Sequence, residues 1–274
     1  MEHPNLLKLA RLHAFSPVAI SLLHRLDNDD VSIKEIVGLV ESDAALAVEI
    51  LAYVNSPLFA MGQTIVDLQQ AIVALGLENT KSIATTLATR AMLKSAPKPA
   101  VARRIWRHSI ATSMVARQLA PVYGVSPDLA GTAGILHDVG RIGLLAQYGE
   151  EYAQFVVKRY TSVDAILEGE RETFALDHCD VGKYLGVAWT LPDVFHGVIS
   201  RHHAAKGEAG ITGLINLACA LADDLSFDAI AHEDLTSVEQ RITDWVGEPQ
   251  RIQLMSCWRD CEQQIRAKVD SLDF

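Results

Sequence analysis

The 274-residue chain is short of cysteine, of aromatic residues and of positive charge, and it has no long apolar run. Its four cysteines form no Cys-x-x-Cys pair, and we interpret them as reduced core residues of a cytoplasmic protein. No stretch approaches the roughly 18–20 apolar residues of a membrane span, and the N-terminus has no signal-peptide pattern, so no membrane contact is expected. A net charge of −10 disfavours a nucleic-acid partner, because Lys and Arg must neutralise its phosphates.

Helix-forming residues dominate what is present. Hydrophobic residues make up 49% of the chain, Ala and Leu are plentiful and turn clusters are sparse, which predicts an all-α fold. Ser16, Ser32 and Asp43 each stand before apolar residues at helical spacing, as N-cap residues do. The stretch from Lys94 to Pro99 contains two prolines and breaks this pattern. We therefore predict two packed helical lobes, residues 1–97 and residues 98–274.

Histidines interrupt the apolar stripes of four helices in the second lobe, and two helices bring carboxylates. The residues concerned are His108, His137, Asp138, His178, His202, the adjacent His203, and Asp223. Any single histidine among them is most simply a hydrogen-bonded core residue. Together they indicate one shared polar centre, because a buried ionised carboxylate is costly unless it is paired or coordinates a metal.

The order His108, His137-Asp138 and Asp223 resembles the HD superfamily of metal-dependent phosphohydrolases, and the further histidines resemble its two-metal members. Other motifs resemble the HDOD domain, an all-helical family found in bacterial signal transduction. They include residues 15–17 (Phe-Ser-Pro), 54–59 (Val-Asn-Ser-Pro-Leu-Phe), 70–76 (Gln-Ala-Ile-Val-Ala-Leu-Gly), 106–109 (Trp-Arg-His-Ser) and 189–192 (Trp-Thr-Leu-Pro). The resemblance extends over about residues 6–225.

This resemblance implies a metal-dependent phosphohydrolase in which two divalent transition metal ions activate water on a phosphoester or nucleotide. Iron, manganese, nickel or zinc would suit the imidazole ligands. Asp138 would bridge the ions and act in catalysis. The first ion would be held by His108, His137 and Asp223, and the second by His178, His202 and His203. Arg104 or Arg107 would neutralise the substrate phosphate.

Two departures from the HD-GYP phosphodiesterases disfavour cyclic di-GMP as the substrate. No Gly-Tyr-Pro follows His202-His203, and Arg104 stands where some of those enzymes supply a third-metal Glu. A second interpretation is a non-catalytic signalling module with a structural or vestigial metal centre. Its first lobe, which has no cluster of ligand-type residues, would dock a signalling protein. A third interpretation is a redox-responsive iron sensor, since His and carboxylate ligands suit iron.

Overall fold

A computed structural model of the chain describes residues 16–27, 32–55, 64–94, 96–203, 208–233, 236–248 and 250–271. Within these ranges the regular structure is helical, and the pairing of extended backbone is limited to one isolated bridge between Tyr160 and His232. The predicted all-α class is therefore confirmed. Residues 1–15, 56–59 and 272–274, which belong to the predicted lobes and motifs, lie outside the described residues.

The first helices begin where the N-cap pattern predicts. Ser16 accepts a hydrogen bond from the Ala19 backbone, Ser32 forms a capping box with Glu35, and Asp43 accepts from Leu46. These helices are α2 (Pro17–Leu23), α3 (Ile33–Glu41), α4 (Ala44–Val54), α5 (Leu68–Leu75) and α6 (Leu77–Lys94), with a short 3₁₀ turn, η1 (His24–Asp27), after α2.

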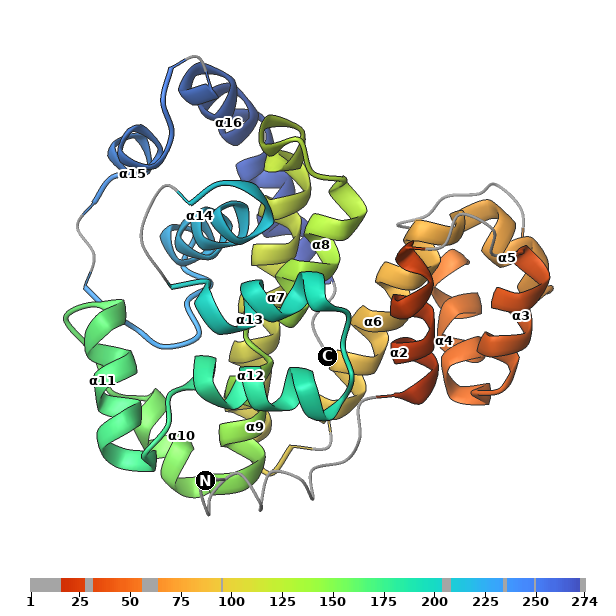
Figure 1. The fold of residues 1–274 in the computed structure, drawn as a ribbon, viewed down its shortest axis with the longest axis horizontal. Helices are drawn as coiled ribbons and strands as arrows, with labels where there is room; N and C mark the ends of the chain where they lie inside the picture. Colours follow the sequence, from red (N-terminus) through yellow and green to blue (C-terminus); the bar gives the residue numbers. More distant parts are fainter. Residues whose placement is uncertain are drawn as a thin grey trace.

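The rest of the described chain forms a larger body in which α7 (Pro99–Leu119) packs against α8 (Pro127–Leu136), α14 (Gly210–Asp224) and α16 (Gln250–Ser271). Helix α9 (Val139–Tyr148) contacts α7 and packs against α12 (His178–Ala188), which in turn contacts α13 (Asp193–Arg201). Figure 1 shows this body with α7 at its centre. The other elements are η2 (Ala120–Tyr123), α10 (Glu150–Val156), α11 (Val163–Phe174) and α15 (Val238–Trp245).

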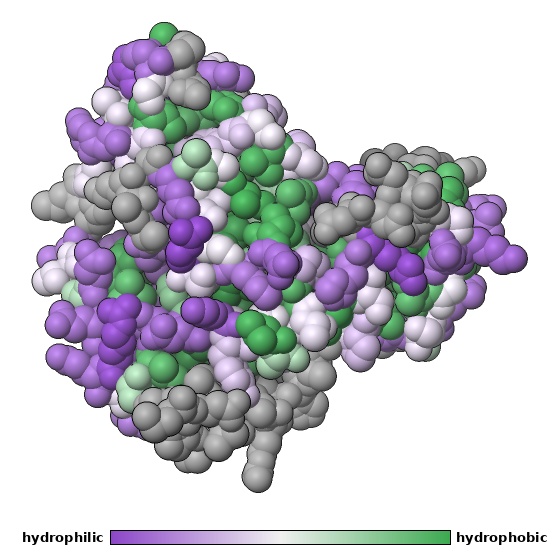
Figure 2. Space-filling model, viewed as in Figure 1, coloured by the Kyte–Doolittle hydropathy of each residue, from purple (hydrophilic) through white to green (hydrophobic). Residues whose placement is uncertain are grey.

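The buried hydrophobic side chains form two clusters, and α6 contributes to both. Its Leu87 belongs to the smaller cluster beneath α2–α5, whereas its Leu93 belongs to the larger cluster around α7. In Figure 1, α3–α5 stand to one side of the body and α6 leads back to it. Figure 2 shows hydrophobic surface gathered in the hollow between them. The boundary at residue 97 stays a prediction, because the two clusters divide within α6, ahead of the Pro97–Pro99 break.

The helices that carry the predicted site approach one another closely at glycines. A Cβ atom on Gly140 of α9 would lie 1.8 Å from the carbonyl oxygen of His178 on α12. A Cβ atom on Gly134 of α8 would lie 2.5 Å from the Cα atom of Ser113 on α7. Both positions therefore require glycine, and the close contacts bring the backbones around His137 and Asp138 against their neighbours.

None of the helices within the described residues is both long enough and apolar enough to cross a membrane.

We predict that Gly140→Ala destabilises the protein, because α9 and α12 must move apart to admit the methyl group. Overpacking of this kind costs about 1–3 kcal/mol. The control is Gly38→Ala in the exposed face of α3, where nothing lies within 4 Å of the added atom and helix propensity favours Ala by about 0.5–1 kcal/mol. Urea unfolding followed by circular dichroism measures both; equal stabilities of the two variants would contradict the packing described.

Candidate metal centre

Five of the predicted ligands come together at the ends and faces of five helices. His108 lies on α7, His137 is the C-cap residue of α8, Asp138 is the N-cap residue of α9, His178 begins α12 and His202 is the C-cap residue of α13. Each is at most 2% exposed. Asp138 makes no side-chain bond to cap α9, so its carboxylate is free to turn into the centre.

The Asp138 carboxylate lies between two groups of imidazoles. Its Oδ1 atom is 3.4 Å from Nε2 of His178 and 3.4 Å from Nε2 of His202. Its Oδ2 atom is 3.7 Å from Nε2 of His108 and 3.9 Å from Nε2 of His137. The two oxygens therefore face two different sets of nitrogen ligands, as a carboxylate that bridges two cations does.

The orientation of each imidazole is fixed from behind, at Nδ1, by an oxygen atom. Nδ1 of His108 is 3.0 Å from the Phe227 carbonyl oxygen, and Nδ1 of His137 is 2.7 Å from that of Gly134. Nδ1 of His202 is 3.2 Å from the carbonyl oxygens of Val198 and Ile199. Because a carbonyl oxygen only accepts hydrogen bonds, Nδ1 carries the proton in each ring. In the neutral imidazoles the lone pair is then on Nε2, the nitrogen that faces the centre.

The Nε2 lone pairs point toward one another, and there are too few protons between them for each to accept a hydrogen bond. Nε2 of His108 and Nε2 of His137 face each other at 3.1 Å, and two lone pairs attract only through a cation or an added proton. Among the described residues, Asp138 Oδ1, His202 Nε2 and His203 Nε2 are buried without a hydrogen-bond partner. Since buried polar atoms are normally satisfied, the donor set fits a divalent transition metal, which prefers imidazole together with carboxylate.

His203 completes the second group of ligand atoms. Its ligand atom and those of Asp138, His178 and His202 all lie within 4.8 Å of one another. Burial lowers the pKa of His202 and places the pKa values of His137 and His203 well below the ordinary imidazole value. These three rings are therefore neutral at pH 7, as metal-binding imidazoles must be.

The other two imidazoles lie beside groups that favour their protonated form. Burial lowers the pKa of His108, but Cys219 and the Asp223 carboxylate more than offset this and raise it well above 6.5. Burial and a nearby guanidinium likewise oppose protonation of His178, yet Glu170 helps to raise its pKa to about 10. The centre therefore favours positive charge at these rings, and either protons or metal ions supply it.

Two charged residues of the centre, Arg141 and Glu170, were not predicted from the sequence. Arg141 Nε donates to Asp138 Oδ2 at 2.7 Å, and Arg141 Nη1 donates to Glu170 Oε1 at 3.1 Å. Glu170 also accepts from the backbone and from Nδ1 of His178, at 2.9 and 2.6 Å, and from Tyr152 at 3.2 Å. Burial raises the pKa of Asp138, but the positive charge of Arg141 helps to hold it well below its usual range, so the carboxylate is ionised.

The available signal for Glu170 was its position in α11. Ile166, Leu167, Glu170 and Phe174 form one buried stripe of that helix, so the carboxylate interrupts an apolar face as the histidines do. Arg141 follows His137 by four residues and stands near the start of the otherwise apolar helix α9. A charged residue inside an apolar stripe was thus as informative as a histidine there.

Asp223, Arg104 and Arg107 lie differently from the predicted arrangement. Asp223 Oδ1 is 3.3 Å from Nδ1 of His108, the nitrogen on the side away from His137. Arg104 pairs with the carboxylate of Asp228, and the Arg107 guanidinium lies 5.2 Å from the centre of the Phe227 ring. The guanidinium that contacts Asp138 is that of Arg141, so phosphate binding by Arg104 and Arg107 stays a prediction.

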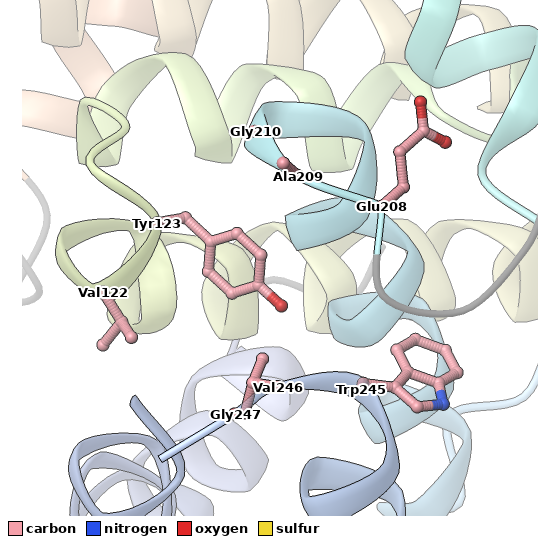
Figure 3. Close-up of a pocket in the computed structure, with 8 residues that line it drawn as sticks. All are labelled: Val122, Tyr123, Glu208, Ala209, Gly210, Trp245, Val246 and Gly247. Atoms are coloured by element: carbon pink, nitrogen blue, oxygen red, sulfur yellow. The ribbon is translucent and has the colours of Figure 1, made fainter. Parts of the chain in front are cut away.

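A cavity of about 290 Å³ lies at the opposite end of α14 from Asp223 (Figure 3). Tyr123 and Trp245 form two of its walls. Glu208, the carboxylate among its lining residues, pairs with Arg201 at 3.1 Å. None of the predicted ligands lines this cavity, so it is separate from the metal centre.

Comparison with known proteins identifies the family. A sequence profile of the HDOD domain matches residues 12–205. This chain therefore belongs to the HDOD family, as its motifs predict. A curated protein of Treponema pallidum (strain Nichols), named "Uncharacterized protein", is 25% identical over 191 residues. The alignment covers 67% of this chain and 36% of that protein, so the chain spans about a third of the length of its curated relative.

Solved structures of low sequence identity share the fold. The "HDOD domain protein with unknown function" of Geobacter sulfurreducens is 24% identical with a TM-score of 0.78, covering 96% of this chain and 97% of that one. A "Putative signal transduction protein" of Marinobacter aquaeolei VT8 is 19% identical, with a TM-score of 0.71 over 98% and 62% of the two chains. A "Putative metal-dependent phosphohydrolase" of Shewanella amazonensis SB2B is 18% identical, with a TM-score of 0.60 over 95% and 100%.

We predict that Glu170→Gln destabilises the protein by about 2–4 kcal/mol, because one amide oxygen cannot replace a carboxylate that accepts from His178, Arg141 and Tyr152. The matched control is Glu172→Gln on the exposed face of the same helix, where a change within about 0.5 kcal/mol is expected. Thermal and urea unfolding measure both. A Glu170→Gln protein as stable as the Glu172→Gln protein would contradict the assigned role of this carboxylate.

Proposed function

We propose that this chain is a signal transduction protein whose buried His-Asp centre binds divalent transition metal ions. The observation that carries the proposal is the convergence of imidazole Nε2 atoms on both oxygens of Asp138, with three buried atoms left without a partner. Ligand side chains oriented from behind by hydrogen bonds at Nδ1 are typical of metal sites. Iron, manganese, nickel and zinc all suit this mixture of imidazole and carboxylate.

The centre offers positions on both sides of Asp138. His178, His202 and His203 face one carboxylate oxygen, and His108 and His137 face the other. Our proposal is therefore that two ions share Asp138. Through their ligands these ions would link the helix ends that carry the ligands. Because such ions bind only the folded chain, they would also stabilise it.

Burial favours a non-catalytic role for these ions. Asp138 and four of the histidines are at most 2% exposed, and Arg141 lies against the bridging carboxylate. Structural metal sites are enclosed by protein ligands, whereas catalytic sites keep one position open to water and substrate. We therefore propose that the metal centre fixes the arrangement of α7, α8, α9, α12 and α13, and that signalling depends on a protein partner. Docking of that partner on the N-terminal lobe stays a prediction.

Phosphoester hydrolysis at the same centre is the second candidate. It is favoured by the ligand groups on both sides of the Asp138 carboxylate. Two ions that share one carboxylate would lower the pKa of a bound water and polarise a phosphoryl oxygen. His203 is the partly exposed member of the ligand group, so access from solvent would be on its side. Asp138 would bind both ions, and Arg141 would orient the Asp138 carboxylate.

We predict that the purified protein contains iron, manganese, nickel or zinc, measured by elemental analysis. Asp138→Ala should lose this metal and lower Tm by more than His203→Ala does, because Asp138 contacts both ligand groups. A chelator should lower the Tm of the unmodified protein toward that of Asp138→Ala. Absence of transition metal, together with a Tm indifferent to chelator, would refute the metal centre.

A separate assay distinguishes the two candidate roles. With manganese or iron added, we predict no turnover of cyclic di-GMP, mononucleotides or a generic aryl phosphate above that of Asp138→Ala, because the centre is enclosed. Steady-state release of phosphate or of the aryl group measures this. Turnover that the Asp138→Ala variant abolishes would make the protein a phosphohydrolase. Turnover of cyclic di-GMP in particular would show that Gly-Tyr-Pro is dispensable.

A further inference from the structure

Cys219 lies in the metal centre, although the sequence pattern marked it only as a core residue. It is on α14 and 3% exposed. Its Sγ atom is 3.5 Å from Nε2 of His108, and the ligand atoms of His108, His137 and Cys219 all lie within 4.8 Å of one another. Two inward-facing imidazole nitrogens and one sulfur atom thus form a compact group.

Asp223, one helical turn further along α14, approaches the same histidine from the other side. Its carboxylate contacts Nδ1 of His108, whereas Cys219 contacts Nε2. The lone pair on Nε2 and the N–H bond on Nδ1 point in different directions from the imidazole ring. A cation bound to Nε2 of His108 is therefore too far from a carboxylate beside Nδ1 to bind that carboxylate as well. Asp223 instead lies behind the ring, beside the Nδ1–H group whose hydrogen bond the Phe227 carbonyl oxygen accepts, and its charge supports that orientation, as carboxylates behind metal-binding histidines do.

We propose that the Cys219 thiolate, and not the Asp223 carboxylate, is the third protein ligand of the cation held by His108 and His137. The proposal rests on the proposed metal centre and deepens it. On binding, the sulfur–metal bond forms as the thiol proton leaves to solvent, and the charge of the cation is offset by the thiolate and by the nearby Asp138 Oδ2. A thiolate with two imidazoles selects a borderline or soft ion, so zinc or ferrous iron is expected here and magnesium is not.

Cobalt(II) is the probe for this ligand set. The 274-residue chain, stripped with chelator and reconstituted with Co²⁺ without oxygen, should show an intense near-ultraviolet absorption from thiolate-to-cobalt charge transfer. It should also show the weaker visible bands of ligated cobalt. Cys219→Ser and Cys219→Ala should both lose the near-ultraviolet absorption, while the Asp138 side retains cobalt and its visible bands. Circular dichroism checks that at least one of the two variants is folded.

Control variants separate the ligand from its surroundings. Cys179→Ser, a change at a buried free cysteine on α12, should keep the near-ultraviolet absorption. Cys257→Ser with Cys261→Ser should keep it as well. Asp223→Asn should also keep it and weaken Co²⁺ binding by about 10–100-fold, the usual cost of losing a carboxylate behind a ligand.

Each remaining outcome overturns a defined claim. Visible bands without near-ultraviolet absorption in the unmodified protein would refute the Cys219 ligand and leave the proposed metal centre standing. A near-ultraviolet absorption that survives both Cys219 variants would assign it to another cysteine and equally refute the proposal. Complete absence of cobalt binding would overturn the metal centre together with the ligand proposed for it.

Discussion

An ionised carboxylate buried among imidazoles is the constraint on which the rest of this structure depends. Asp138 is 2% exposed, and isolating such a charge from water is expensive unless positive groups surround it. Arg141 supplies one of them through a direct hydrogen bond. The remaining oxygen, Oδ1, faces the Nε2 atoms of His178 and His202 and has no hydrogen-bond partner among the described residues. Metal ions at these positions would meet the same electrostatic demand, which is why we place the function there.

The surrounding helices are arranged to hold these groups in one orientation. Backbone carbonyl oxygens fix three of the imidazoles from behind, and Glu170 fixes the fourth. Gly140 allows the chain beside Asp138 to lie directly against the start of α12. The centre is enclosed, which suits the proposed role of metal ions that hold these helices together. It suits rapid exchange of substrate less well.

Much of the fold could be predicted because its signals are local. N-caps at Ser16, Ser32 and Asp43, and apolar residues at helical spacing, depend on neighbours within one or two turns. The same spacing marked His108, His137, His178 and His202 as buried. Burial together with the family resemblance was enough to gather them into one centre.

The roles within the centre could not be predicted in the same way. A helical stripe says that a side chain points inward, but it does not say which ring nitrogen meets which partner. Cys219 and Asp223 lie one turn apart on α14, yet they contact opposite sides of His108. Arg141 and Glu170 are joined only by tertiary packing, across 29 residues of sequence. Such distinctions depend on the distances between helices, which no local pattern encodes.

The most direct test of the central claim is a crystal structure of the purified protein with anomalous diffraction data collected at the absorption edges of its metals. The account predicts an anomalous peak beside the Asp138 carboxylate, within bonding distance of Nε2 atoms of the surrounding histidines. A centre with no anomalous peak, in which water or protons alone join the imidazoles to Asp138, would contradict it.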